Sequence, residues 1–505
     1  MQGYVAQAEY DALKAHCEKL EFQIAEFKRM IFGAKSERFV PQEESTQLSL
    51  FWAPLSEAEE QGPVKETKVE SHTRISQPKE QPKRQALPEW LERRVEVLEP
   101  DVDTSDMVKI GEEITERLEY EAAKLVVHQI IRPKYAPKQG KHSAEGCTIQ
   151  IAPLPTHPIL RCIAAVSLLA IIAIEKYIDH LPLYRQQGRY RRLGMEISRS
   201  TLCGWVAQTA NVLEILYDKL VELVLLSRYI QGDETTIRVL EKKSKTNAGS
   251  SGKKKKNRTH QGYYWVFQDV TNKLLFFRYH KSREQGLPYN ILQFFKGILQ
   301  VDGYSAYQGM DKLFGLTLIH CWAHARRKFE KALGNDRQRA AYVLEKLQPV
   351  YALEERARKE QLSFEQRGQL RREKALPIIK ALFGWLEEQI NYVLPSSPIG
   401  EAIAYTLKRK KELMHYLEDG ELEIDNNLVE NAIRPVALGR KNYLFAGSHD
   451  AAQRAAIFYS LFACCRQHQV DPYQWLVDVL NRLPDHPVNR IEELLPHLWQ
   501  PLNKT

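Results

Sequence analysis

Long apolar runs and cysteines are both scarce in this sequence of 505 residues, and each shortage excludes a class of protein. The most apolar run, Cys162 to Ile174, has 13 residues without a charge, fewer than the roughly 20 that a helix needs to cross a bilayer. We therefore expect a buried helix there and no membrane partner. The seven cysteines are odd in number and scattered, and no secretory signal is visible, which excludes a disulfide framework and favours reduced thiols in a cytoplasm.

Positive charge, by contrast, is in excess. The chain has 72 basic and 64 acidic residues, a formal net charge of +8, and such an excess fits a polyanionic partner. The segment Glu241 to Arg258 carries seven Lys and one Arg against one Glu, and includes Lys253, Lys254, Lys255 and Lys256. We expect an exposed loop between two strands that contacts nucleic acid; a solvated loop without a function is the alternative.

Apolar residues near the N-terminus recur at intervals of four and three over nearly four heptads, which predicts a coiled coil over residues 1–35 and self-association through it. The seam consists of Ala6, Tyr10, Leu13, Cys17, Leu20, Ile24, Phe27 and Ile31. A helix that packs on its own domain is the alternative. Residues 36–89 contain the end of a basic motif and then a stretch rich in Glu, Lys, Gln, Ser and Pro, which predicts a flexible linker.

Two smaller regions follow the linker. Residues 90–157 are expected to form a small mixed module, in which IIRPKYAP reads as a strand followed by a turn. Residues 158–226 are expected to be helical, with Arg191 and Arg192 in a basic segment, then Gly194, then Ser198 as the N-cap of the next helix. Two helices around a glycine turn are typical of a helix-turn-helix whose second helix reads DNA. A solvated basic face on a helical connector is the alternative.

Two short apolar runs each deliver an Asp at a strand end or a turn. In YIQGDETTIRVL, strand alternation puts Asp233 and Thr235 on one face and Glu234 on the other. In LQVDGYSAY, Gly303 lets the chain turn sharply after Asp302. A lone Asp in either place would be an ordinary turn or cap residue. The two Asp residues therefore indicate a catalytic site only if a third acid accompanies them.

The third acid lies in the segment Glu423 to Ser448, for which a short helix is predicted. If this helix opens at Asn426 or Asn427, Glu430 shares a face with Arg434, and Pro435 ends or kinks the helix just after. Two structural alternatives compete with a catalytic role. Asn427 and Glu430 have the spacing of a capping box, and Glu430 and Arg434 that of an ordinary i,i+4 ion pair.

The order strand Asp, strand Asp, helix Glu, with 69 and then 128 residues between the acids, is used by nucleases and transposases with a ribonuclease-H-like core. Three carboxylates supply the hard oxygen ligands that two Mg²⁺ ions, roughly 4 Å apart, need across a scissile phosphate. We therefore expect a multidomain, mixed α/β protein. Its ribonuclease-H-like catalytic core comprises residues 227–329 and 419–450, separated by a large helical insertion over 330–418 and followed by amphipathic C-terminal helices over 451–505.

Cations close to the acids in the sequence are candidate contacts for DNA phosphates. They are Arg326, Arg327, Lys328, Arg434, Arg440 and Lys441. His320, Cys321 and His324 precede the first of them and could suggest a metal site, but no fourth ligand is evident, and a packed strand end is the alternative.

Taken together, these motifs resemble those of the DDE transposases of the insertion-sequence 66 family. The resemblance rests on GDET, VDGYSAY, HCWAHARRKF, DGELEIDNNLVENAIRPVALGRKNYLFAGS and the segment from Leu168 to Val206, with weaker similarity toward both ends of the chain. It implies that Asp233, Asp302 and Glu430 are the catalytic triad and the ligands of two Mg²⁺ ions, for which Mn²⁺ can substitute. Relatives commonly carry paired CxxC motifs in the small module, whereas this chain has only Cys147 between residues 100 and 150, so we do not expect structural zinc.

The resemblance further implies a bacterial transposase that cleaves DNA at the ends of its insertion sequence and joins the freed 3′ hydroxyls to target DNA. The expected partners are the terminal inverted repeats, target DNA, further copies of the chain and small accessory proteins of the same element, in the cytoplasm at the nucleoid. Two other classes remain open. One is a DNA-binding regulator with a silent core, which the intact acids argue against; the other is a structure-selective nuclease.

Overall fold

A computed structural model describes residues 87–89, 91–121, 124–137, 149–241, 259–284 and 286–502, which belong to one compact unit that begins at Arg84. The predicted coiled coil, the linker as far as residue 86 and the cluster from Lys253 to Lys256 lie outside the described residues. Within the described part, no helix is both long and apolar enough to cross a membrane.

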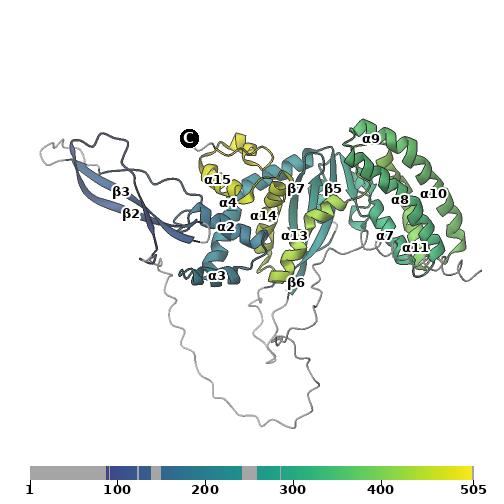
Figure 1. The fold of residues 1–505 in the computed structure, drawn as a ribbon, viewed down its shortest axis with the longest axis horizontal. Helices are drawn as coiled ribbons and strands as arrows, with labels where there is room; N and C mark the ends of the chain where they lie inside the picture. The colour runs from purple at the N-terminus through teal and green to yellow at the C-terminus, as the bar shows by residue number, and fades with distance from the viewer. Residues whose placement is uncertain are drawn as a thin grey trace, which may run out of the picture. The chain divides into compact units, whose positions relative to one another are not determined.

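The first described region is a small sheet (Figure 1). Its strands are β1 (Arg93–Val97), β2 (Met107–Glu121), β3 (Lys124–Pro137) and β4 (Gln150–Ile151). The order is β1-β3-β2, and β4 also pairs with β3. The regular elements among the described residues of this module are all strands, so no helix of the predicted mixed composition is seen in them. The prediction of a turn in IIRPKYAP is wrong, because β3 continues through Pro133. This proline lies between the residues that pair with β1 and those that pair with β4. Its missing N–H therefore removes no hydrogen bond to either strand.

Three helices follow: α2 (Val166–Tyr177), α3 (Leu183–Arg192) and α4 (Arg199–Leu226). Ser198 is the N-cap of α4, since its hydroxyl accepts a hydrogen bond of 3.1 Å from the Thr201 N–H, and Gly194 has φ +86° in the turn before it. Helix α4 is 28 residues long. Its buried stripe from Leu202 to Val224 packs on the central sheet and on α14, because apolar residues recur there with the helical period.

The central sheet has five strands in the order β7-β6-β5-β8-β9. They are β5 (Tyr229–Leu240), β6 (Thr259–Asp269), β7 (Leu274–His280), β8 (Ile298–Val301) and β9 (Thr317–His320). Strand β6 pairs antiparallel with both β5 and β7. Strand β8 pairs parallel with β5, and β9 pairs parallel with β8. The short helices α5 (Gly286–Leu292) and α6 (Met310–Phe314) lie in the connections before β8 and β9. The fold is thus mixed α/β, as predicted, and both strands expected to deliver an Asp are present.

A group of helices with a hydrophobic core of its own follows β9 (green in Figure 1). Its members are α7 (Trp322–Ala332), α8 (Arg337–Lys359), α9 (Phe364–Leu370), a π-helical turn (Arg371–Ala375), α10 (Leu376–Gln389), α11 (Pro398–Lys408) and α12 (Lys410–Met414). Buried Trp322, Phe329, Leu347 and Phe383 belong to this core. The insertion is therefore a layer of helices whose core also takes in Tyr229 of β5 and Ile319 of β9.

Three helices close the described chain: α13 (Asn427–Tyr443), α14 (His449–Gln467) and α15 (Pro472–Arg482). Of the two effects predicted for Pro435, an end of the helix is wrong, because α13 continues to Tyr443; a kink stays a prediction. Burial of Val436 and Gly439 beyond the proline offsets the missing hydrogen bond. The prediction that α14 is amphipathic is also wrong. All but a few residues from Ala452 to Cys465 are buried, since α14 packs on β7, α4 and α2 together.

Candidate active site

Two glutamines set the position of Asp233 and Asp302. Gln231 and Gln300 are paired neighbours on the parallel strands β5 and β8, and the Gln231 side-chain amide donates a hydrogen bond of 2.8 Å to the side-chain oxygen Oε1 of Gln300. Asp233 and Asp302 each come two residues later. Because side chains alternate along a strand, the register brings both carboxylates to the same level of the sheet.

The turn after Asp302 is held by the helical insertion. The Tyr405 hydroxyl donates to the Asp302 carbonyl oxygen at 2.6 Å, and Arg409 donates to the Gly303 carbonyl oxygen at 3.0 Å. Gly303 has φ +84°, and a Cβ there would lie 2.5 Å from the Arg409 side chain. Only glycine fits this close approach, so the insertion fixes the backbone that carries Asp302.

Glu430 lies in the first turn of α13 and faces α7. Its carboxylate oxygens are 3.7 Å from His324 Nε2 and 3.5 Å from Arg327 Nη2. Neither structural alternative is seen in the described residues: Asn426 is the N-cap and makes no capping hydrogen bond, and no ion pair joins Glu430 to Arg434. Glu430 is therefore directed toward the site rather than along its own helix.

The acids influence one another electrostatically. Burial raises the pKa of Asp233 well above its usual range, and the nearby carboxylates of Glu234, Asp302 and Glu430 raise it further, against a hydrogen bond from the Glu234 N–H. Burial lowers the pKa of His324, while Asp302 and Glu430 oppose that shift. Asp302 and Glu430 thus both contribute to the raised pKa of Asp233.

Glu234, next to Asp233, is a further acid that the sequence placed on the opposite face. Arg283 donates to its Oε1 at 2.9 Å, and its Oε2 is buried without a hydrogen-bond partner. Burial raises the pKa of Glu234 despite this ion pair, and Asp302 contributes to the rise. Glu234 is therefore a further half-buried acid beside Asp233, held by Arg283.

The chemistry of Asp233, Asp302 and Glu430 suits a hard cation, since carboxylate oxygens are the ligands that Mg²⁺ prefers. In the described ranges, however, no three His, Cys, Asp or Glu side chains lie close enough together to hold a metal ion. Glu430 is instead turned toward His324 and Arg327. Cys321, part of the alternative metal site, is buried, and its Sγ accepts a hydrogen bond of 3.3 Å from the Asn426 N–H.

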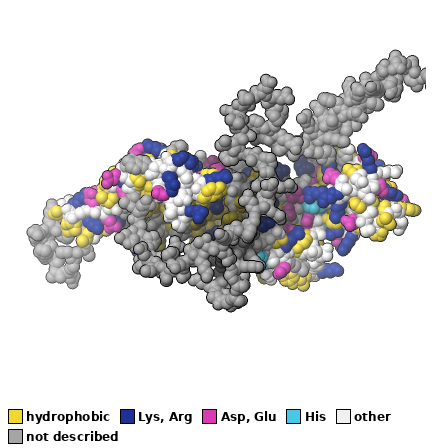
Figure 2. Space-filling model, turned by 90° about the horizontal axis from the view of Figure 1, so that it is seen from below, with side chains coloured by type: hydrophobic (Ala, Val, Ile, Leu, Met, Phe, Trp, Pro, Cys, Tyr) yellow, Lys and Arg dark blue, Asp and Glu magenta, His cyan; other side chains and the backbone are white. Residues whose placement is uncertain are grey.

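A basic cavity of about 280 Å³ opens beside Asp302. Its lining residues are Asp302, Gly303, Tyr304, His324, Arg327, Lys328, Lys331 and Tyr405. Two of the three cations predicted on α7 thus lie at the site, whereas Arg326 pairs with Glu330 at 3.3 Å and lies over the Tyr351 ring. Lys331 was missed, although its helical spacing from Arg327 and Lys328 could have identified it. Figure 2 shows Lys and Arg side chains with His beside them toward the insertion.

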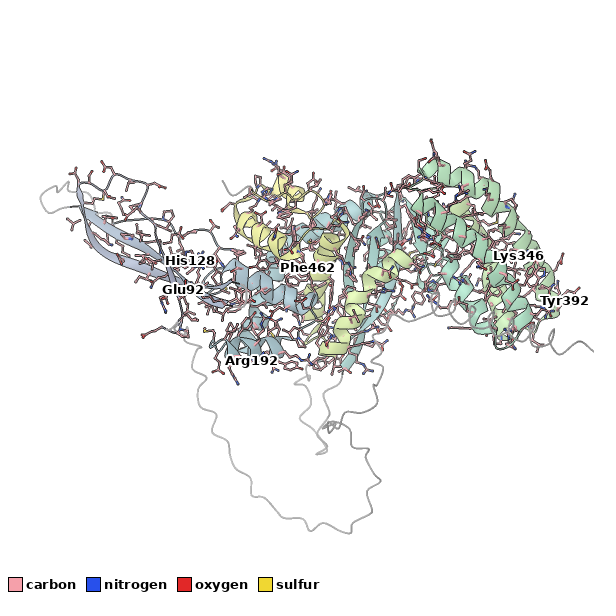
Figure 3. All side chains as sticks on the ribbon, viewed as in Figure 1. Glu92, His128, Arg192, Lys346, Tyr392 and Phe462 are labelled. Carbon is pink, nitrogen blue, oxygen red and sulfur yellow. The ribbon has the colours of Figure 1, made fainter. Side chains whose placement is uncertain are left out.

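The other predicted DNA contacts differ in their surroundings. Arg440 donates hydrogen bonds to Thr235 Oγ1 at 3.0 Å and to the Thr236 carbonyl oxygen at 2.6 Å, so it joins α13 to β5. Lys441 and Arg434 are exposed on α13. On α3, Arg191 pairs with Glu196 at 2.7 Å, and Arg192 is exposed near the end of the helix (Figure 3).

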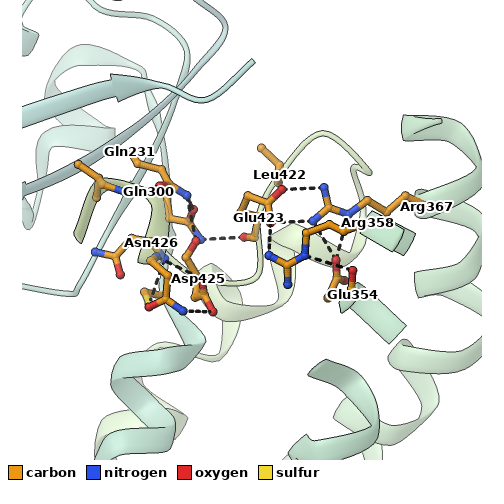
Figure 4. Close-up of polar contacts among 12 residues, drawn as sticks. Gln231, Gln300, Glu354, Arg358, Arg367, Leu422, Glu423, Asp425 and Asn426 are labelled. Atoms are coloured by element: carbon orange, nitrogen blue, oxygen red, sulfur yellow. Dashed lines mark hydrogen bonds and ion pairs between the residues drawn. The ribbon is translucent and has the colours of Figure 1, made fainter. Parts of the chain in front are cut away.

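A buried polar network behind the acids was not predicted (Figure 4). The Gln231 amide also donates to the Asp425 carbonyl oxygen at 2.9 Å, and the Gln300 amide donates to the Glu423 carbonyl oxygen at 2.8 Å. Arg371 donates to both oxygens of Glu354, at 2.7 and 2.8 Å. The network connects the sheet, the segment before α13 and the insertion, so it fixes where the Glu430 helix begins.

Comparison with known protein families gives three matches. The family described as "Transposase IS66 family" matches residues 161–454, "IS66 C-terminal element" matches residues 460–497, and "Transposase C of IS166 homeodomain" matches residues 19–96. The first of these matches spans more than half of the chain.

Similar proteins occur in Sinorhizobium fredii (strain NBRC 101917 / NGR234). "Uncharacterized protein y4qI" is 35% identical over 445 residues, which cover 84% of this chain and 79% of that protein. "Uncharacterized protein y4jD" is 31% identical over 509 residues, covering 95% and 94%. A solved structure, "Crystal structure of a pre-cleavage Mos1 transpososome", aligns at 12% identity over 35% of this chain and 63% of that chain. Its TM-score of 0.11 is too low to indicate a shared fold.

Proposed function

Because the chain belongs to the IS66 family of transposases, we propose that it cleaves DNA at the ends of a bacterial insertion sequence and joins the freed 3′ hydroxyls to target DNA. The observation that carries the proposal is the common level of Asp233 and Asp302 on adjacent parallel strands, with Glu430 electrostatically coupled to Asp233. Cleavage and joining are both phosphoryl transfers, for which positioning and charge stabilisation supply most of the catalysis.

The catalytic core is, in this proposal, ribonuclease-H-like. Three antiparallel strands followed by two strands parallel to the first, in the order β7-β6-β5-β8-β9, support it. Asp233 then lies on β5, Asp302 directly after β8, and Glu430 on the later helix α13. The insertion between α7 and α13 supports the turn after Asp302 through Tyr405 and Arg409.

Asp233, Asp302 and Glu430 would hold the divalent cations, two Mg²⁺ for which Mn²⁺ can substitute. Bound there, such ions supply charge neutralisation at the scissile phosphate and activation of the attacking oxygen. Arg327, Lys328 and Lys331 line the cavity beside Asp302 and bind the DNA backbone. Structural zinc is not part of the proposal.

The homeodomain-related match at residues 19–96 supports DNA as the partner. We propose that the terminal inverted repeats and the target are the DNA bound, that the coiled coil joins copies of the chain, and that accessory proteins of the same element assist at the nucleoid. Of the predicted DNA contacts, exposed Arg192 and Lys441 fit this role directly, whereas Arg191 and Arg440 already bind other groups within the chain.

The test uses the full chain, labelled element ends and Mg²⁺. Asp233→Asn, Asp302→Asn and Glu430→Gln should each reduce cleavage and joining by several orders of magnitude while DNA affinity changes little, because each substitution keeps the shape of the side chain and removes a charge that balances a cation. Double variants should be hardly worse than single ones, as expected for groups that act together.

Asp311→Asn on α6 is the matched control and should keep its activity. Asp269 would be a poor control, because its buried carboxylate accepts hydrogen bonds from Asn272 at 3.0 and 2.8 Å. Joining at a near wild-type rate by any triad variant would remove that residue from the site. Cleavage without joining by the wild type would indicate a nuclease, and binding without cleavage a regulator.

A further inference from the structure

A second cavity, of about 320 Å³, lies apart from the acids on the same face of β5. Ile237 lines it, and Ile237 follows Asp233 by four residues on one strand, so about 13 Å of strand separates them. Other parts of the wall come from the ends of α2 and α13, the segment between α13 and α14, the start of α14 and one side of α4. The volume is within the range of small-ligand pockets.

This cavity is mostly apolar, but two cations, Lys176 and Arg454, and no acid are among its lining residues. Lys176 Nζ lies 5.3 Å from the Tyr177 ring centroid and 5.1 Å from that of Tyr443. In the described part of the chain neither Lys176 nor Arg454, which also lines the cavity, has a hydrogen bond or ion pair. Burial lowers the pKa of Lys176. Two cations without counter-charges in an apolar wall favour an anionic ligand.

The start of α14 adds to this positive potential. Ser448 caps the helix by accepting from the Ala451 N–H at 3.1 Å, and both residues line the cavity. Helix α14 has 19 residues, so the partial positive charge at its N-terminus is directed toward the same space.

Aromatic side chains form the remaining wall. Tyr177 stacks on Phe458 at 4.7 Å, which fixes its ring, whereas Phe445 lines the cavity with 40% of its surface exposed. The backbone around Phe445 is fixed: the Ala446 N–H donates to the Arg238 carbonyl oxygen at 2.8 Å, and the Leu240 N–H donates to the Ala446 carbonyl oxygen at 2.9 Å. An exposed ring on a fixed backbone is a suitable surface for a planar ligand.

We propose that this cavity binds one unpaired nucleotide of the DNA substrate, with its base against Phe445 and Tyr443 and its phosphate at Lys176 and Arg454. A flat aromatic group attached to an anion matches both halves of the wall, and every base has a face that can stack. A base inside a duplex cannot enter, so the nucleotide must be unpaired or extruded. The proposal rests on the DNA activity proposed above, because the cavity lies along the strand that carries Asp233.

The test compares the full-length protein bound to a blunt duplex and to the same duplex with one unpaired 2-aminopurine nucleotide. Wild type should prefer the second duplex and quench its fluorescence. Phe445→Ala and Lys176→Met should each reduce that preference about tenfold and leave affinity for the blunt duplex unchanged. Lys176→Arg should restore most of the preference, and Phe445→Ala should restore fluorescence.

Two residues of the insertion serve as matched controls, and Figure 3 labels both. Lys346 lies over the Tyr342 ring at 5.3 Å, the distance of Lys176 from the Tyr177 ring, and Tyr392 is an exposed aromatic residue. Lys346→Met and Tyr392→Ala should keep the wild-type preference. Equal preference in wild type, Phe445→Ala and Lys176→Met would overturn the nucleotide site alone. Failure of wild type to bind either duplex would overturn the transposase proposal as well.

Discussion

Arg367 and Glu423 are joined by two parallel hydrogen bonds, each 2.8 Å long, from the two terminal guanidinium nitrogens to the two carboxylate oxygens. Arg367 belongs to α9 of the insertion, and Glu423 to the segment that leads into α13. Both side chains are buried. Paired forks of this kind fix direction as well as distance, so the insertion orients the chain a few residues before Glu430.

Loss of one partner of this pair should be costly. Arg367→Met would leave the Glu423 carboxylate buried with little compensating charge, and we expect it to lower the free energy of unfolding by about 3–5 kcal/mol. Urea unfolding measures the change. Arg356→Met is the matched control, because Arg356 makes an exposed i,i+4 pair with Glu360, and exposed pairs of this kind contribute little to stability. Similar losses in the two variants would mean that the fork does not stabilise the fold.

Asp425 should make stability depend on pH. Burial raises the pKa of its carboxyl to about 6, against about 3.9 in an unfolded chain. The unfolded chain therefore releases this proton at lower pH, so the contribution of Asp425 becomes unfavourable as the pH rises from about 4 to 6, by about 3 kcal/mol in all. In urea unfolding between pH 4 and 7, Asp425→Asn should gain stability relative to wild type as the pH rises. A constant difference would contradict the assignment.

Arg440 and Lys441 should differ although they are neighbours. Arg440→Met removes hydrogen bonds to Thr235 and Thr236 and should lower the free energy of unfolding by about 1–3 kcal/mol. Lys441→Met should leave stability unchanged and, if the exposed ammonium contacts a phosphate, reduce the slope of log affinity against log salt by about 0.9. Thermal unfolding and DNA binding at several salt concentrations separate the two effects. Identical behaviour of the two variants would reject the distinction.

The coiled coil over residues 1–35 stays a prediction, since it lies outside the described residues. Leu20→Pro removes a helix hydrogen bond from the seam at about 3 kcal/mol or more and should reduce the mass seen by sedimentation. Leu87→Ala, outside the seam, is a control that should not change the assembly. An unchanged mass for Leu20→Pro would show that copies do not associate through this segment.

The positions of Asp233 and Asp302 could be predicted because strand alternation and a glycine turn are local properties of the sequence. The length of α13 could not be predicted, since the burial of Val436 and Gly439 after Pro435 depends on the sheet that they meet. The burial of α14 on nearly all sides could not be predicted either. It depends on the several elements that surround this helix, and the sequence of the helix alone does not reveal them.

Pairings across long sequence separations were the least predictable part of the site. Arg367 and Glu423 are 56 residues apart, and no periodicity relates them. The sequence predicts that Arg440 contacts a phosphate. The local sequence, an arginine followed by a lysine, does not distinguish an arginine that faces DNA from one that faces a strand of its own protein. The partner, Thr235, lies 205 residues away, and only the fold brings it near.

The central position of α14 has a consequence for the order of events on the ribosome. Most residues from Ala452 to Cys465 are buried against β7 and two earlier helices, so the sheet that carries Asp233 and Asp302 lacks part of its cover until this late segment has been synthesised. At roughly 5–20 residues per second, translation from Asp233 to Gln467 takes on the order of ten seconds or more. A nascent chain interrupted before α14 would therefore lack part of its core, so we expect partial products of translation to be inactive in the DNA cleavage proposed above.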